Sequence, residues 1–518
     1  MKFKIINQFY KVIIFAPLLI YCGKRSYIAY DEGFYALQAR WILQTDNWII
    51  PFWLDQYVLD RTIGIQFLIA KCQQLLGETS FVAHLPTTLA AGLMLILTYK
   101  LHQELISKND AIFSSLILGT TYIWLDFAHL ATQDMIFASL VTLGIYSLSK
   151  LIKEENSIYL FVFGSWIGLA FMMKTFLIGV PLITLFPYMF YKRKIINHNV
   201  FWLGVIIGFL PFVIWSFSIN QYLDKNIIYF LLDKYNNLSS KNSFTNPYYY
   251  YLWNIPLNFL PWSLPSIFGL IYQFKRNNKV SYLLVYFPIF FIIILSLFST
   301  KTPYYTLSIS SILSINAYIG LREILSSYKL KSLLIKITSN IIPIIFFIAI
   351  TIYFLAIRES INLYLKEELF LILGLSLAAL ILLSIKKLKS SKSLLLSLII
   401  SPYLLGLCVV QSGLLTDRSR NLRETLEYTF SKENLMNNPT YITSVNTGDN
   451  NSTAKFIKIL LLTPNLKYGI KDLQDLKSSE LAWIQESESS DLNQEQYEII
   501  ANNKILSPWK LIKKRNKK

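Results

Sequence analysis

The sequence predicts a mainly α-helical membrane protein that crosses the bilayer many times and ends in a small α/β domain. Of its 518 residues, 54% are hydrophobic and only 15% are charged, and its mean hydropathy is +0.43. A soluble core of this length needs far less apolar surface. The apolar residues also gather into runs of membrane-spanning length, whereas the sequence after residue 411 contains none.

Runs of about 17 to 25 predominantly apolar residues are long enough to cross the hydrocarbon core of a bilayer as helices. The chain contains about thirteen of them, at residues 5–22, 82–100, 111–128, 134–149, 158–174, 176–191, 200–219, 257–273, 281–298, 304–321, 340–357, 368–385 and 393–411. The first run follows basic residues and could be a cleaved secretion signal. However, no small-residue cleavage site follows Cys22, so we expect a retained first span.

The loops between these runs alternate between many and few lysines and arginines. The basic loops, which fall on the side of Lys2 and Lys4, contain Lys100, Lys108, Lys150, Lys153 and residues 192–194, 275–279, 322–336 and 386–392. The positive-inside rule then places the N-terminus in the cytoplasm, beneath a plasma (inner) membrane, and an odd number of spans places the C-terminus outside. The net charge of +18 could suggest a nucleic-acid ligand, but this alternation favours topology signals, so we expect no nucleic-acid partner.

Three segments on the outer side are too polar to span a membrane. Residues 24–80 and 220–256 are outer loops within a transmembrane domain that we place at residues 1–411. The third is the tail, which we predict to be a soluble extracytoplasmic domain at residues 412–518.

The tail is long enough to bury a small core of its own. Its runs Tyr441–Val445 and Leu460–Leu462 are strand-like or buried and lie between turn-rich stretches. We therefore expect a compact α/β fold there.

Two adjacent carboxylates, Asp31 and Glu32, follow the first apolar run. Asp31 is well placed to cap a helix whose apolar residues Phe34, Leu37 and Trp41 recur at helical spacing. Such a helix would lie along the membrane surface. Carboxylates in a chain that is otherwise so apolar most often belong to a working site at a membrane face.

More charged side chains are expected at the outer mouths of the helices. With the first two acids, the set comprises Asp31, Glu32, Asp60, Arg61, Asp126, His129, Asp134, Lys174 and Lys301. Mixed charge of this kind suits a cavity that binds a lipid-linked phosphate and handles a polar group beside it. The alternative is that each is an ordinary interfacial charge, either snorkelling or paired with a neighbour.

Two lysines are candidates for binding an anion. Lys174 stands between two apolar runs, so its ammonium needs a counter-ion, either a phosphate or a carboxylate such as Asp134. Lys301 lies in a short outer turn with Tyr304 and Tyr305. A cation with two phenols makes a good set of donors to a diphosphate or phosphodiester.

Motifs for metals and nucleotides are missing from the sequence. The four histidines form no HxH, HExxH or HxxxH pair, and there is no GxGxxG, Walker, GxSxG or DxD motif. His129 with Asp126 and Asp134 could bind a divalent metal, although a single interfacial histidine is more often structural. We therefore expect no cofactor, keep this metal site as the alternative, and expect a lipid to carry the activated group.

Six motifs, in order, resemble those of the GT-C class of membrane glycosyltransferases, in particular the aminoarabinose-transferase-like and protein O-mannosyltransferase-like group. Residues 31–36 (DEGFYA) resemble the family's DE(A/G)RYA, and Asp60-Arg61 stands where the family has an acid followed by lysine in YF(D/E)KPP. The others are Asp134-Met135 for LDMP, residues 168–174 for GLAFLTKG, residues 247–251 with 261–263 for PFWYYLP and LPWS, and residues 301–305 for KLPHYLLP.

The resemblance implies a GT-C type fold with a catalytic cavity on the outer side, a polyprenyl-phosphate sugar as donor, and a lipid, glycan or protein acceptor in or near the bilayer. It implies inversion at the anomeric carbon by analogy. The roles it implies are catalysis by Asp31, Glu32 and Asp134, donor-phosphate binding by Arg61, Lys174, Lys301, Tyr304 and Tyr305, and acceptor or sugar binding by Tyr35, Asp60 and His129.

The chain also departs from these motifs. Phe34 replaces the family's arginine, Arg61 its lysine, and Thr62-Ile63 its two prolines, while Tyr304 stands where histidine is common. A transition-metal site that some relatives could build from glutamate and histidine is therefore not expected, and the donor sugar need not be aminoarabinose.

A lipid or solute transporter is the main alternative function, because many spans with buried charge also describe transporters. Against it, the sequence shows no inverted repeat and no paired Gly/Pro-broken helices in corresponding halves. An inactive scaffold subunit would have lost its acids, whereas Asp31, Asp60 and Asp134 are all present.

Overall fold

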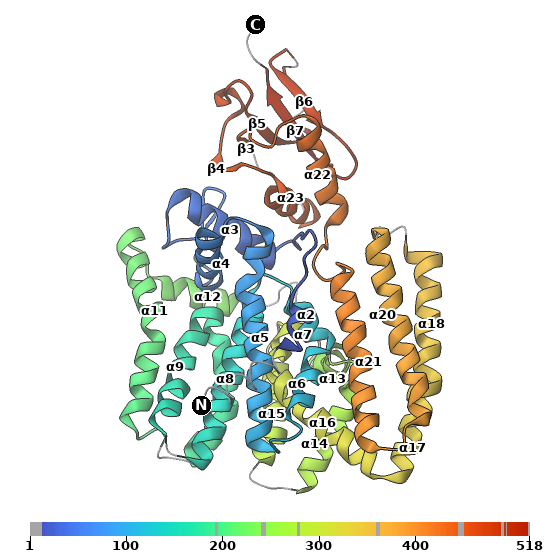
Figure 1. Ribbon diagram of the computed structural model, residues 1–518. Coiled ribbons are helices and arrows are strands. Elements are labelled where there is room, and N and C mark those ends of the chain that lie inside the picture. Colours follow the sequence, from blue (N-terminus) through green and yellow to red (C-terminus); the bar gives the residue numbers. More distant parts are fainter. Residues whose placement is uncertain are drawn as a thin grey trace.

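Long helices run side by side in a bundle, and a small α/β domain covers one end of it (Figure 1). This computed structural model describes residues 13–515 apart from Glu155, 192–194, 240–244, 277–279, 359–362, 444–449, 488–491 and Gln494. The beginning of the predicted first span and the basic residues Lys2 and Lys4 therefore lie outside the described residues.

The prediction of a helical membrane protein is confirmed. Within the described residues, seven helical runs are long and apolar enough to cross a membrane, or eight if the bent pair α13 (Tyr250–Asn258) and α14 (Ser263–Arg276) forms one span. The seven are α5 (Ser80–Leu105), α8 (Gln133–Lys153), α9 (Ser157–Lys174) with α10 (Gly179–Tyr191), α11 (Asn199–Leu223), α17 (Tyr328–Lys336) with α18 (Ile342–Ile352), α20 (Leu365–Ser384) and α21 (Ser391–Gln411).

Several predicted runs are not single straight helices, so the count of thirteen is not confirmed. The run 111–128 divides into α6 (Ala111–Gly119) and α7 (Tyr122–Phe127). The run 281–298 contains the π-helical turn η2 (Tyr282–Tyr286) and α15 (Phe287–Leu297), and the run 304–321 contains the 3-10 turn η3 (Pro303–Ile309) and α16 (Ser310–Ser326). The chain bends by 115° between α13 and α14, where Pro261 lacks a backbone N–H donor.

Pairs of glycines hold α9 and α11 at close range. Gly164 and Gly168 of α9 lie four residues apart, as do Gly204 and Gly208 of α11. A Cβ atom on Gly168 would lie 2.2 Å from the carbonyl carbon of Gly208, and one on Gly204 would lie 2.2 Å from the Phe161 oxygen. Small residues at this spacing let two helix backbones touch in a membrane. This contact positions α9, whose last residue is Lys174.

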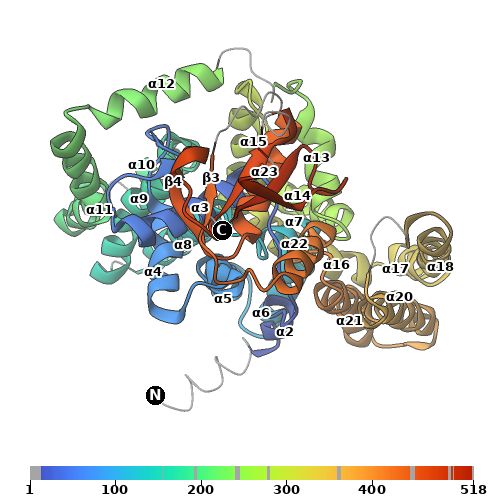
Figure 2. The ribbon, with the colours of Figure 1, turned by 90° about the horizontal axis from the view of Figure 1, so that it is seen from above.

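The two outer loops gather at the end of the bundle that the C-terminal domain covers, with α12 along one edge and the domain over the middle (Figure 2). Residues 24–80 form α3 (Asp31–Thr45), the strands β1 (Phe52–Trp53) and β2 (Gln56–Tyr57), and α4 (Gly64–Leu76). Residues 220–256 contain α12 (Ile227–Ser239).

The helix expected near Asp31 is present, and most of its side chains are buried. Asp31 is its first residue, and Tyr30, with a φ of 62°, is the N-cap. Its polar residues Glu32 and Gln38 are only 1% and 2% exposed. The reason is that Glu32 meets His84 of α5 and Gln38 meets Gln66 of α4, while the C-terminal domain packs on another face of the helix, which only the tertiary structure reveals.

The C-terminal domain is an α/β fold, as its sequence predicted. Its five strands are arranged in the order β4-β3-β5-β7-β6, with bounds β3 (Thr440–Ile442), β4 (Leu466–Ile470), β5 (Leu481–Gln485), β6 (Tyr497–Ala501) and β7 (Trp509–Lys514). Strand β3 is parallel to β4 and β5, because the helix α23 (Asn450–Leu462) returns the chain from β3 to β4. Leu460–Leu462 is thus the buried end of a helix and not a strand.

A network of buried charges fastens the C-terminal domain to the bundle. Asp417 accepts hydrogen bonds from Arg420 and Arg423 of α22 (Arg420–Lys432), at distances of 2.8 to 3.2 Å. Arg420 also pairs with Glu367 in the first turn of α20, at 2.5 Å. Asp126, expected at the rim of a cavity, instead pairs with Arg418. The tail is therefore held in place by ion pairs whose partners lie on separate elements.

Candidate active site

Asp134 and Lys174 form a buried ion pair between α8 and α9. Asp134 lies in the first turn of α8, and Lys174 is the last residue of α9. Their side chains are 5% and 8% exposed, and the lysine Nζ donates to Asp134 Oδ1. The same Nζ lies 4.2 Å from the ring centre of Tyr304 and 5.2 Å from that of Tyr305. Of the two partners expected for Lys174, the structure shows the carboxylate.

Arg61 is the centre of a second group of polar side chains. It donates to both carboxylate oxygens of Asp60 at 3.0 and 3.1 Å, to Asp31 Oδ1 at 3.4 Å and to the Tyr35 hydroxyl at 3.2 Å. Lys234, from α12, donates to Asp60 Oδ2, the oxygen that also accepts from Arg61 Nη2. Burial favours a higher pKa for Asp60, but Arg61 and Lys234 outweigh it and hold that pKa well below its usual value. Asp60 is therefore a counter-ion that stays charged.

The two groups are neighbours. A Cβ atom on Gly64, three residues after Arg61, would lie 2.5 Å from the oxygen of Met172, two residues before Lys174. The rings of Tyr304 and Tyr305 lie with their centroids 5.0 Å apart, next to the Nζ of Lys174. Both phenol hydroxyls can donate hydrogen bonds.

A cavity of about 590 Å³ adjoins Asp60, between the β1–β2 hairpin and α12. It is lined by Asp55, Gln56, Tyr57, Leu59, Asp60, Lys225, Phe230, Asp233 and Lys234. Sequence reasoning treated 220–256 only as a polar loop and missed Lys234. The adjacent charges Asp233-Lys234, in a stretch rich in apolar and aromatic residues, were the signal that could have identified it.

Glu32 turns away from these side chains. It is 1% exposed, and its carboxylate accepts hydrogen bonds from the backbone N–H groups of Ile28 at 2.7 Å and Ala131 at 2.9 Å. The Nε2 atom of His84 lies 2.9 Å from the same carboxylate. Both of its oxygens are therefore engaged in joining the outer loop to α5 and to the turn before α8.

His129 and Lys301 are also engaged elsewhere. His129 is 1% exposed, its Nδ1 lies 2.8 Å from the Leu125 oxygen, and burial lowers its pKa to about 4, which keeps the ring neutral. Lys301 Nζ donates to the backbone oxygens of Asn246 at 2.9 Å and Phe298 at 2.5 Å. Lys301 thereby shapes the turn that carries the two phenols.

Of the expected site residues, the structure therefore brings together Asp31, Tyr35, Asp60, Arg61, Asp134, Lys174, Tyr304 and Tyr305. The trio proposed for a metal is not formed, since Asp126 pairs with Arg418 and Asp134 with Lys174. Throughout the described part of the chain, no group of three or more His, Cys, Asp or Glu side chains could hold a metal ion.

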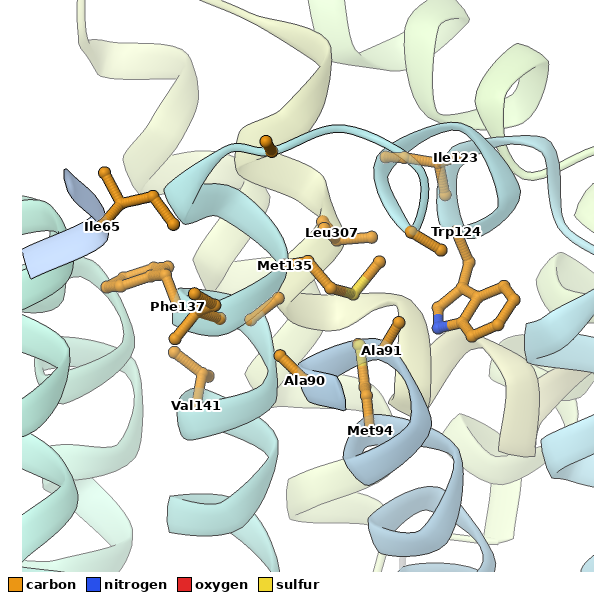
Figure 3. Close-up of a cluster of buried hydrophobic side chains, with 14 of the residues drawn as sticks. Ile65, Ala90, Ala91, Met94, Ile123, Trp124, Met135, Phe137, Val141 and Leu307 are labelled. Atoms are coloured by element: carbon orange, nitrogen blue, oxygen red, sulfur yellow. The ribbon is translucent and has the colours of Figure 1, made fainter. Parts of the chain in front are cut away.

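An apolar layer supports the site from within the bundle. Figure 3 shows part of one cluster of buried side chains, which includes Ile65, Met94, Trp124, Met135 and Leu307, from α4, α5, α7, α8 and η3. Met135 follows Asp134 directly, and Leu307 follows Tyr305 by two residues. Because such an interior is close-packed, it holds the polar side chains above it in defined positions.

Residues 60–216 match the family model described as dolichyl-phosphate-mannose-protein mannosyltransferase. Among curated proteins, the chain is similar to the undecaprenyl phosphate-alpha-4-amino-4-deoxy-L-arabinose arabinosyl transferase of Wigglesworthia glossinidia brevipalpis, at 26% identity over 65% of this chain and 62% of that protein. It is also similar to that of Aeromonas hydrophila, at 24% identity over 48% of this chain and 47% of that protein. The chain thus spans less than two thirds of the length of these relatives.

The crystal structure of ArnT from Cupriavidus metallidurans bound to undecaprenyl phosphate has a similar fold. The similarity covers 98% of this chain and 96% of that chain, with a TM-score of 0.71 and 14% sequence identity. The expected GT-C type fold is therefore confirmed, including the small domain at the C-terminal end.

Proposed function

We propose, on the premise that this chain is one of the GT-C class of membrane glycosyltransferases, that it moves a sugar from a polyprenyl-phosphate carrier to an acceptor on the extracytoplasmic side. One observation carries the proposal. Asp31, with half of its side chain exposed, is paired to Arg61, and Gly64, three residues after Arg61, packs against the oxygen of Met172, two residues before the lysine of the buried pair Asp134–Lys174. An accessible carboxylate thus stands beside cations and hydroxyl donors.

The donor's phosphate would meet the cations and phenols. When the bond between the sugar C1 atom and the phosphate oxygen breaks, negative charge grows on the departing lipid phosphate. Arg61 offers a planar set of N–H donors, and Tyr304 and Tyr305 offer hydroxyls beside Lys174. Asp60 and Lys234 keep Arg61 in place from the side of the cavity.

Asp31 would handle the acceptor. If the acceptor is a hydroxyl, Asp31 takes its proton as the oxygen attacks C1. If the acceptor is a phosphate, it is already ionised and no base is needed. Asp134, buried and paired, would orient Lys174 instead of reacting. The acceptor is of the lipid, glycan or protein class, the donor sugar a hexose or pentose, and inversion at C1 follows by analogy with the class.

The proposal includes the topology. Thirteen spans within residues 1–411 would place the N-terminus in the cytoplasm and the domain 412–518 outside the inner membrane. The gathering of both outer loops and the C-terminal domain at one end supports this arrangement. An alkaline phosphatase fused to the C-terminus should be active in intact cells, and an inactive fusion would contradict the orientation.

A transfer assay tests the activity. Purified protein in vesicles is given radiolabelled polyprenyl-phosphate sugars and a membrane extract as the source of acceptors. The wild type and the control Asp475→Asn, which changes an exposed acid of the C-terminal domain, should move label to an acceptor. Asp31→Asn should not move label to a hydroxyl acceptor. Label that crosses the vesicle membrane without a new covalent product would reject the enzyme in favour of a transporter.

A further inference from the structure

One face of α3 is covered by the C-terminal domain along most of its length. Gly33, Leu37, Arg40 and Gln44 recur at spacings of three and four residues, which places them on a single side of the helix. This helix begins with Asp31, the carboxylate that leads the candidate site. Any contact that sets the position of α3 along or around its axis therefore also sets the position of Asp31.

Arg40 binds the C-terminal end of α23. Its Nη1 donates to the oxygens of Leu460 at 3.4 Å and Thr463 at 3.2 Å, and its Nη2 donates to that of Leu461 at 3.4 Å. The last carbonyls of a helix lack partners within the helix, and a cation there is favourable for the helix dipole. The Arg40 Nε is paired with Glu78, which fixes the guanidinium in this orientation.

Gln44 binds the edge strand β4. Its Nε2 donates to the Leu466 oxygen at 2.7 Å, and its Oε1 accepts from the Tyr468 N–H at 2.8 Å. The amide thereby takes the place of a neighbouring strand at an edge that would otherwise be unpaired. The ring of Tyr468 also packs edge-on against that of Trp41, with centroids 5.8 Å apart.

Gly33 allows the helix to approach this closely. A Cβ atom at this position would lie 2.5 Å from Ile457 Cγ2 of α23 and 3.0 Å from the oxygen of Ile28. The contact at Gly33 is two residues from Asp31, so α23 lies against the first turn of α3 as well as against Arg40.

We propose that the C-terminal domain positions the catalytic end of α3 through Arg40 and Gln44, an inference that rests on the proposed function. Neither residue touches the candidate site, so both are positioning residues. In this arrangement the domain is part of the active-site framework, since α3 is held between the bundle and α23.

The variants Arg40→Met and Gln44→Leu test the proposal in the full-length protein. Each removes the hydrogen bonds while retaining most of the side-chain volume. Turnover should fall by about 10- to 100-fold while the donor KM stays unchanged, because a small misplacement of a catalytic group lowers the rate by that order. Arg40→Lys should recover part of the loss. Lys471→Met is the matched control, because it breaks an ion pair with Glu480 inside the domain that does not involve α3.

Hydrogen exchange provides a readout that does not depend on the reaction. The amides of residues 31–45 should exchange faster in Arg40→Met and Gln44→Leu than in the wild type, whereas strands β5 and β7 should exchange as before. The proposal is overturned if both variants keep wild-type turnover and wild-type exchange in α3, or if Lys471→Met has the same effects as they do. A wild type that transfers no sugar, while residues 31–45 still exchange faster in the two variants, would reject the proposed function. That result would still support the contact between α3 and the C-terminal domain.

Discussion

The buried pair Asp134–Lys174 allows the sharpest prediction. Its side chains are 5% and 8% exposed, so removing one partner leaves the other charge in a place that water hardly reaches. Breaking such a pair costs about 3–5 kcal/mol of folding free energy, whereas an exposed pair would be worth about 0–1 kcal/mol. The burial therefore predicts the larger cost for Lys174→Met and for Asp134→Leu.

The double variant Lys174→Met with Asp134→Leu should behave differently from either single one. It leaves no unpaired charge, and apolar replacements of similar volume for a buried pair are often neutral or stabilising. Methionine also retains a favourable contact with the ring of Tyr304, over which the lysine Nζ lies at 4.2 Å. We therefore expect its free energy of unfolding to be near that of the wild type.

The free energies of unfolding of the three variants and the wild type are measured in mixed detergent micelles, with tryptophan fluorescence as the signal. The transfer assay is run on the same samples. All three variants should be inactive, although one of them is as stable as the wild type, which separates catalysis from folding. Single variants that are no less stable than the double variant would refute the reasoning, because the pair would then behave as a solvated one.

Three further outcomes are expected. Asp31→Asn should lower the initial rate of transfer by about 10²- to 10⁴-fold if the acceptor is a hydroxyl, with unfolding unchanged because the side chain is half exposed. Since the pKa of Asp60 is held below its usual value, its ion pairs stabilise the fold at pH 7 and pH 5, and this contribution should be lost only as the pH falls below about 3.9. The free energies of unfolding of the wild type and Asp60→Asn should therefore differ at pH 5, and the difference should shrink steadily as the pH falls below about 3.9. A constant difference would contradict the assignment. Glu32→Gln should lower the free energy of unfolding by about 1–3 kcal/mol, because the amide cannot accept all the bonds the carboxylate accepts. Its turnover per folded molecule should stay at the wild-type level, and a loss there would assign Glu32 to catalysis.

The sequence alone was sufficient for the membrane class and for long apolar helices such as α11, although not for the breaks within other runs. Whether a stretch such as 199–223 enters a bilayer depends on its own composition, and the helical spacing around Asp31 depends on neighbouring residues. The sequence also predicted that Lys174 needs a counter-ion, either a phosphate or a carboxylate. An ammonium group between two apolar runs is costly to bury unless an anion is paired with it.

Only the tertiary structure decided which polar residues meet. Lys234 and Asp60 are 174 residues apart in the sequence, and Arg40 lies about 420 residues from the carbonyls that it binds. Glu32 stands beside Asp31 in the sequence, yet it faces His84 while Asp31 faces Arg61. Hydropathy and helical spacing depend on neighbours along the chain, whereas the partner of a charged side chain depends on how distant helices pack.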